Sequence, residues 1–126
     1  MMIVGIGTDI VQIARIGASS DRLGEKFAAR ILTPDELQQW QEHARPTVFL
    51  AKRFAVKEAA SKALGTGIGR GVSWQHFHID HNEWGAPQLR FSEGAAERAE
   101  QLGVNRIHLT LSDEQDHVVA FVVLEQ

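Results

Sequence analysis

The chain has 126 residues, of which 44% are hydrophobic and 23% are charged, and its net charge is −3. This length and balance fit a single globular domain over residues 1–126 and exclude an intrinsically disordered chain. The chain has no cysteine, which excludes disulfides and thiolate chemistry, and its mild acidity excludes bulk binding of nucleic acid.

The first predicted element is a strand over residues 3–10, an apolar run in which Gly5 and Gly7 allow another backbone to come close. The run lacks a basic leader and contains Asp9, so we interpret it as a strand and not as a signal peptide. The longest later apolar run, residues 118–124, is too short to span a bilayer. We therefore expect a cytoplasmic protein that does not bind membranes.

Three helices are predicted next. Asp21 is a candidate N-cap for a helix with one apolar face. That face consists of Leu23, Phe27 and Ile31. Residues 33–36, Thr-Pro-Asp-Glu, predict a capping box with proline at the first helical position, for a helix that ends near residues 43–46. Residues 47–64 are small or apolar nearly all round, which predicts a buried central helix that ends at Gly65.

Glycine recurs at positions 65, 67, 69 and 71, directly after the central helix. A phosphate-binding P-loop precedes its helix and ends in Gly-Lys-Ser/Thr, and this segment does neither. We therefore interpret it as a flexible helix cap and hinge.

The last third of the chain predicts strands and one helix. Alternating residues 76–81 and 87–91 predict two strands joined by a turn. Residues 92–102 predict a helix capped by Ser92 and ended by Gly103. Two further strands are expected over residues 106–112 and 117–124. The final strand is apolar on both faces and must be covered on both, so one cover is expected to be another subunit.

Two carboxylates stand out from these apolar elements. Glu58 and Lys62 share one sector of the central helix with small and aromatic residues, where they either pair with each other or form part of a site. Asp9 ends a buried strand, where an acid needs a cation or a metal ion. One strand carboxylate and one helix carboxylate suit a magnesium site, although no local pattern shows that Asp9 and Glu58 meet.

Histidines and basic residues give weaker signals. His76, His78 and Asp80 share one strand face, which indicates a hydrated face more than a metal cluster. His108 shares a polar face with Thr110 and Ser112, as a satisfied histidine or as a phosphate contact. A basic strip is either a solvated helix face or a docking site for an acidic partner. It consists of Arg15, Arg22, Lys26 and Arg30.

Together these segments resemble the holo-acyl-carrier-protein synthase family of 4′-phosphopantetheinyl transferases, nearly end to end. The matching segments are residues 5–9 (Gly-Ile-Gly-Thr-Asp), Arg15-Ile16, residues 30–33 with Glu36, residues 49–59 (Phe-Leu-Ala-Lys-Arg-Phe-Ala-Val-Lys-Glu-Ala), Lys62-Ala63, residues 65–67, residues 85–87 and the strand of His108. The resemblance implies an α+β fold, with an antiparallel sheet packed against a long central helix. It also implies transfer of 4′-phosphopantetheine from coenzyme A to a serine of acyl carrier protein, in support of fatty acid biosynthesis.

The resemblance further assigns roles to residues. Asp9 and Glu58 match magnesium ligands, and Glu58 and Lys62 are the candidate catalytic residues. Residues expected to bind coenzyme A are Arg53, Lys57, Lys62, Gly65 and His108. The basic strip, Arg15, Arg22, Lys26 and Arg30, matches the segment that meets the acidic helix of acyl carrier protein.

Family members are typically homotrimers with sites at subunit interfaces, in agreement with the doubly apolar last strand. In many members a histidine follows the serine that corresponds to Ser112. Here Asp113 occupies that position, so the role of this histidine does not carry over. Two alternatives remain. One is a binding module that docks carrier protein without transferring anything, and the other is a magnesium-dependent nucleotide pyrophosphohydrolase.

Overall fold

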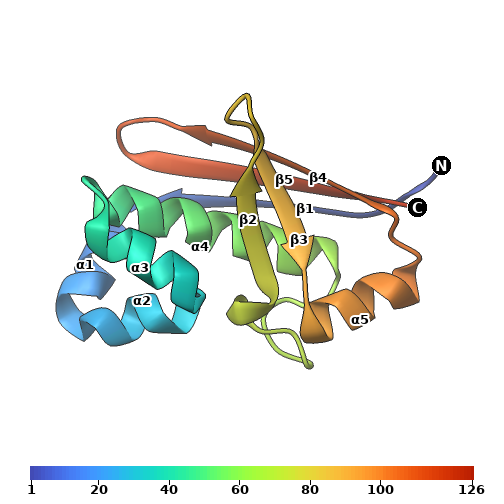
Figure 1. Cartoon of the computed structure of the whole chain (residues 1–126), viewed down its shortest axis with the longest axis horizontal. Coiled ribbons are helices and arrows are strands. Elements are labelled where there is room, and N and C mark those ends of the chain that lie inside the picture. Colours follow the sequence, from blue (N-terminus) through green and yellow to red (C-terminus); the bar gives the residue numbers. More distant parts are fainter.

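The computed structural model describes all residues from 1 to 126 as an α+β fold (Figure 1). In chain order, the elements are β1 (Ile3–Gln12), α1 (Ile13–Leu23), α2 (Glu25–Ile31), α3 (Pro34–Glu42), α4 (Pro46–Ala63), the 3₁₀ turn η1 (Trp74–His76), β2 (Phe77–His81), β3 (Pro87–Phe91), α5 (Glu93–Leu102), β4 (Arg106–Asp113) and β5 (His117–Glu125). The predicted antiparallel sheet and long central helix are confirmed.

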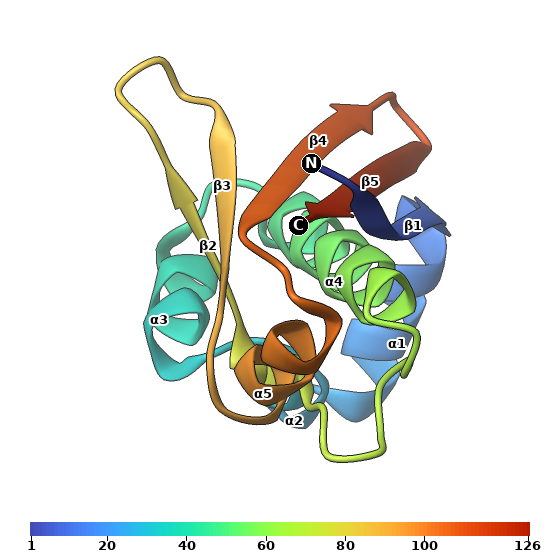
Figure 2. The same cartoon turned by 90° about the vertical axis from the view of Figure 1, so that its right-hand side faces the viewer.

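The strands form two antiparallel sheets. The larger sheet has the order β1–β5–β4, so the last strand lies between the first strand and β4. Strands β2 and β3 form a separate hairpin that projects beyond the rest of the chain (Figure 2). Helix α4 runs along the inner face of the larger sheet, and α1, α2 and α3 pack on the opposite side of this helix (Figure 1).

Helix α4 lies in the centre of one core of 24 buried hydrophobic residues. Two glycines let β1 approach this helix closely. A Cβ atom on Gly5 would lie 2.1 Å from the carbonyl oxygen of Ala63, and one on Gly7 would lie 2.0 Å from that of Ala59. Both distances are far inside van der Waals contact, so only glycine permits this spacing. The close approach brings the end of β1 against the helix.

Strand β5 is covered by the chain on one face only. Its inner residues Val118, Ala120, Val122 and Leu124 are fully buried against α4. On the other side, β1 and β5 expose large apolar side chains, which we call the outer face. It consists of Ile6, Ile10, Val119 and Phe121. No helix of the chain combines the length and the apolar character that crossing a membrane requires.

Two helix caps differ from the sequence-based expectation. Asp21 is not an N-cap, because α1 continues through it to Leu23 and Gly24, with φ of 68°, separates α1 from α2. Ser92 occupies the N-cap position of α5, but its hydroxyl bonds to His78 Nε2 at 2.8 Å instead of capping the helix. The capping box of Thr33 and Glu36 is confirmed.

Candidate active site

Asp9 and Lys62 meet where β1 passes the C-terminal half of α4. The Lys62 ammonium donates to Asp9 Oδ1 at 3.1 Å and to the carbonyl oxygen of Thr8 at 3.0 Å. The Asp9 side chain is mostly buried, and its second oxygen, Oδ2, is buried without any hydrogen-bond partner. A buried carboxylate oxygen without a donor is costly, so this atom is oriented for a ligand that the chain itself does not supply.

Glu58 lies one turn before Lys62 on the same face of α4. Burial and then the negative charge of Asp9 raise the pKa of Glu58, while Lys62 acts in the opposite direction. The charge of Asp9 disfavours the ionised form of Glu58, and a cation shared by the two carboxylates would offset this repulsion. Both line one cavity of about 390 Å³, together with Arg15 and Phe54. The structure therefore brings together the carboxylate pair, Asp9 and Glu58, which the sequence pattern alone did not.

The carboxylate pair fits magnesium in number and kind. Mg²⁺ is commonly bound by one or two carboxylates and completes its octahedron with water and substrate phosphates. The chain has no group of three or more potential metal-ligating side chains, so a dedicated all-protein site is absent. Asp9 Oδ2 is buried and has no hydrogen-bond partner in the chain, so this oxygen is available to bind a metal ion.

The basic strip lies beside this cavity. Arg15 and Arg22 are seven residues apart on α1, and Lys26 and Arg30 are four apart on α2, so each pair shares a helix face. All four side chains are exposed, and none is paired with a carboxylate of the chain. Because Arg15 also lines the cavity of Asp9 and Glu58, the strip begins at the carboxylate pair.

Arg53 and Lys57 have partners inside the protein. Glu36 Oε2 accepts from Arg53 Nε at 2.9 Å, and Glu36 Oε1 accepts from Lys57 Nζ at 2.6 Å. Burial lowers the pKa of both cations, and the carboxylate of Glu36 acts against this effect. Lys57 is 0% exposed in this arrangement. Its contact with coenzyme A, which the resemblance implied, stays a prediction. Arg53 still lines a polar cavity of about 460 Å³, with Lys52 beside it.

The sequence pattern predicts Glu36 as part of a capping box but does not predict its ion pairs with Arg53 and Lys57. Arg53 and Lys57, one turn apart on an otherwise apolar helix, were a signal that a buried carboxylate lies opposite them. Lys52 pairs with Asp113 at 3.6 Å, at the position where the resemblance leads one to expect histidine.

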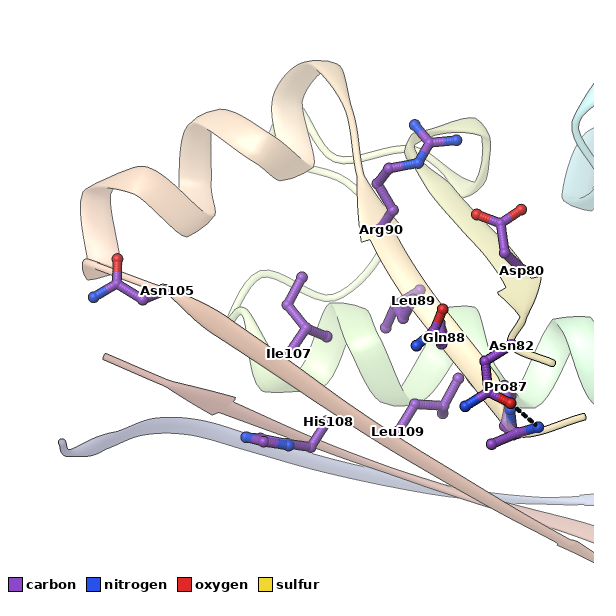
Figure 3. Close-up of a pocket in the computed structure, with 11 residues that line it drawn as sticks. Asp80, Asn82, Pro87, Gln88, Leu89, Arg90, Asn105, Ile107, His108 and Leu109 are labelled. Atoms are coloured by element: carbon purple, nitrogen blue, oxygen red, sulfur yellow. Dashed lines mark hydrogen bonds between the residues drawn. The ribbon is translucent and has the colours of Figure 1, made fainter. Parts of the chain in front are cut away.

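His108 lies apart from the carboxylate pair. It stands on β4 across from Val123, and its Nε2 is 3.1 Å from Glu125 Oε1. A cavity of about 560 Å³ lies between β3 and β4. In Figure 3, His108 stands at its edge, and Ile107 and Leu109 are directed toward β3. Asp9, in contrast, faces α4 on the inner side of the sheet, so His108 and Asp9 of one chain lie on opposite sides.

Gly65 begins the glycine loop directly after α4. Its φ of 79° is in the left-handed region, and Gly67, Gly69 and Gly71 also have positive φ. Arg98 of α5 donates to the carbonyl oxygen of Leu64 at 3.0 Å, which secures the end of α4 at this loop. The predicted cap at Gly65 is confirmed, and its contact with coenzyme A stays a prediction.

Comparisons with known proteins agree with this geometry. Residues 5–122 match the family model described as the 4′-phosphopantetheinyl transferase superfamily. The chain is 58% identical to the holo-[acyl-carrier-protein] synthase of Shewanella frigidimarina, over 99% of both chains. It is similar in structure to the synthase of Neisseria meningitidis, with a TM-score of 0.93, 46% identity and coverage of 99% and 100% of the two chains.

A third relative has a bound nucleotide. The chain is similar to the holo-(acyl-carrier-protein) synthase of Bacillus anthracis in complex with CoA (3′,5′-ADP), with a TM-score of 0.81, 40% identity and coverage of 98% and 97%. Matches of this identity over nearly the full length establish common descent and not only a common fold. The chain belongs to the holo-acyl-carrier-protein synthase family of the 4′-phosphopantetheinyl transferase superfamily.

Proposed function

We propose that this chain transfers 4′-phosphopantetheine from coenzyme A to a serine of apo acyl carrier protein, giving holo acyl carrier protein and 3′,5′-ADP for fatty acid biosynthesis. The observation that carries the proposal is that Asp9 and Glu58 line one cavity with Arg15 of the basic strip, while Lys62 pairs with Asp9 beside it. Membership of the family supports it. The proposal includes that the whole chain acts as one catalytic domain and that it works in the cytoplasm.

In the proposed reaction, the serine oxygen of the carrier attacks the phosphorus next to pantetheine. A bond forms between them, the pyrophosphate bridge breaks, and 3′,5′-ADP leaves with the bridging oxygen. Bound Mg²⁺, held by Asp9 and Glu58, would supply Lewis-acid neutralisation of the phosphate oxygens. Lys62, half exposed beside Asp9, is placed to offset the charge that develops on the departing nucleotide. The protein needs no nucleophile of its own, so its residues contribute position and charge.

Glu58 is our candidate for two roles, metal ligand and catalytic group. In the absence of metal, burial and the charge of Asp9 raise the pKa of the Glu58 carboxyl. A bound cation would act against this effect, because it stabilises the ionised carboxylate. Arg15, Arg22, Lys26 and Arg30 are proposed to bind the acidic carrier protein, with Arg15 nearest to the reacting phosphate.

A homotrimer with sites at its subunit interfaces is part of the proposal. The outer face exposes Phe121 (41%) and Ile10 (66%), more apolar surface than an isolated strand pair tolerates easily. His108 is separated from Asp9 by the sheet, so a neighbouring subunit is needed to present it to the same coenzyme A. In a cyclic trimer, the interfaces join two different surfaces of each chain, which allows this sharing. Arg53, Lys62 and Gly65 complete the proposed coenzyme A contacts.

Intact-mass measurement of apo acyl carrier protein tests the function. The carrier is incubated with this protein, coenzyme A and magnesium, with EDTA in a parallel sample. We expect a gain of one phosphopantetheine group on the carrier, lost with EDTA and lost in Asp9→Asn and Glu58→Gln. A carrier that is bound but gains no mass would identify a binding module instead. Cleavage of coenzyme A without any gain would identify a pyrophosphohydrolase.

A further inference from the structure

The C-terminal end of α2 is held by a side chain with no assigned role. A helix leaves its last carbonyls without partners inside the helix, and these need donors from elsewhere. The amide Nε2 of Gln75 lies 3.0 Å from the carbonyl oxygen of Ala29, 3.3 Å from that of Arg30 and 2.7 Å from that of Leu32. The remaining carbonyl, Ile31, accepts from Lys57 Nζ at 2.7 Å.

Contacts of the turn η1 fix Gln75 in turn. It belongs to η1, whose N-cap is Ser73. The Ser73 hydroxyl accepts from the backbone N–H of Gln75 at 3.2 Å, and the backbone N–H of Ser73 donates to His76 Nδ1. The neighbouring Trp74 ring packs on Phe54 of α4, with ring centroids 5.2 Å apart. The turn therefore contacts both α2 and the helix that carries Glu58.

The helix that Gln75 holds presents half of the basic strip. Lys26 and Arg30 are on α2, and the carbonyl of Arg30 is itself one of the three acceptors of the Gln75 amide. A seven-residue helix has little stability of its own, so its orientation depends on contacts at its ends. Both cations therefore extend from a helix whose last carbonyls Gln75 binds.

We propose that Gln75 is a positioning residue for carrier-protein recognition, holding α2 so that Lys26 and Arg30 face the acidic partner. This inference rests on the proposed function. It assigns Gln75 no contact with coenzyme A, with Asp9 or with Glu58. A loss of its amide therefore weakens carrier binding and leaves the chemical step unchanged.

Gln75→Met tests the proposal, because methionine keeps the length and neutrality of the side chain and removes both donors. We expect the KM for carrier protein, and its directly measured Kd, to rise about five- to tenfold, as loss of several weak hydrogen bonds implies. The KM for coenzyme A and the kcat are expected to stay unchanged. Gln38→Met is the matched control, because Gln38 is exposed on α3 and its side chain makes no hydrogen bond within the chain.

Two readouts separate positioning from general destabilisation. Amide hydrogen exchange over residues 28–32 is expected to accelerate in Gln75→Met and not in Gln38→Met. In an Arg30→Ala background, Gln75→Met is expected to cost less affinity than in the wild type, since one of the cations that it orients is already absent. Gln75→Asn, which shortens the side chain by one carbon, is the second variant and is expected to act in the same direction.

The outcomes are distinct. An active wild-type enzyme with unchanged carrier KM in Gln75→Met overturns this inference alone. Fully additive losses in the double variant also overturn it. A wild-type protein that binds carrier and transfers nothing overturns the proposed function, while a raised Kd in Gln75→Met still supports the positioning role.

Discussion

The ammonium of Lys57 lies 2.6 Å from Oε1 of Glu36 inside the protein, and Arg53 holds the other oxygen of the same carboxylate. Glu36 also accepts from the backbone N–H of Thr33 at 2.9 Å, so one buried side chain joins the start of α3 to two turns of α4. The result is a buried cluster with one anion and two cations. Its stability depends on the anion.

We expect Glu36→Gln to destabilise the protein by about 3–5 kcal/mol, because it leaves two buried cations without a counter-charge. Lys57→Met is expected to cost less, about 1–3 kcal/mol, since the Glu36–Arg53 pair remains and one carbonyl loses its donor. Chemical denaturation measures both. Glu42→Gln, an exposed glutamate of the same helix, is the control and is expected to change little. Equal costs for Glu36→Gln and Glu42→Gln would contradict the cluster.

The raised pKa of Glu58 predicts a pH dependence of stability in the absence of metal. The folded protein holds the Glu58 proton to a higher pH than the unfolded chain does, because burial and Asp9 raise this pKa. Folding stability is therefore expected to fall as the pH rises from the ordinary carboxyl range through the raised pKa. Glu58→Gln is expected to remove this slope, and melting temperatures in EDTA measured against pH check it. Glu97→Gln, an exposed glutamate on α5, is the matched control.

Magnesium is expected to oppose the fall in folding stability with rising pH. Binding to the ionised carboxylate pair stabilises the folded state, so the rise in Tm with magnesium is expected to grow as the pH increases. Asp9→Asn and Glu58→Gln are expected to lose the rise. A magnesium effect of equal size in wild type and both variants would place the ion elsewhere.

The outer face predicts an assembly that Phe121→Glu disrupts. A charge in the middle of an apolar interface is left without a partner, so the variant is expected to be a folded monomer by light scattering. Trp84→Glu, which changes an exposed aromatic side chain at the hairpin tip, is expected to retain the assembly.

Sharing of sites between subunits gives a sharper test of the same interface. Inactive Glu58→Gln and weakened His108→Ala chains, unfolded and refolded together, are expected to recover activity above the sum of the two. Some interfaces then combine an intact Glu58 with an intact His108 of the next subunit. Absence of recovery in a mixed trimer would mean that each chain forms its site alone.

The close approach of β1 and α4 predicts a strong effect of Gly7→Ala. The new Cβ would lie 2.0 Å from the carbonyl oxygen of Ala59, so the strand must move and Asp9 moves with it. We expect a loss of several kcal/mol, in the upper range for overpacking, together with loss of transfer. Gly17→Ala is the control, since its nearest contact would be 3.3 Å away on a side-chain methyl group of Thr47. Comparable stability of the two variants would contradict the close packing.

Local sequence patterns predicted the helices and strands well, but they did not predict most contacts between residues that are far apart in the sequence. The capping box of Thr33 and Glu36 is contained in four residues, so the sequence was sufficient for it. The break at Gly24 was missed because Asp21 offered a plausible cap and the apolar periodicity continued across the glycine. Gln75 has no distinguishing sequence pattern, because its three acceptors are backbone carbonyls more than forty positions away.

The site itself shows the same limit. A carboxylate on β1 and another on α4 are the residue types of a magnesium site, but the sequence pattern did not show that they lie close together. Their meeting depends on the strand pairing of β1 with β5 and on the glycines that admit the helix. The resemblance to a known family did assign Asp9 and Glu58 to one site, because a family motif implies the folded arrangement of its residues as well as their types. It did not reveal that Lys57 is enclosed with Glu36.

The pairing of the first strand with the last has a consequence for the growing chain. Strand β5 is the only neighbour of β1 in its sheet, and the N- and C-termini end near each other (Figure 1). A nascent polypeptide thus contains Asp9 and Glu58 long before it contains the strand that holds them together. We therefore expect a product that ends before β5 to lack the strand pairing on which the meeting of Asp9 and Glu58 depends.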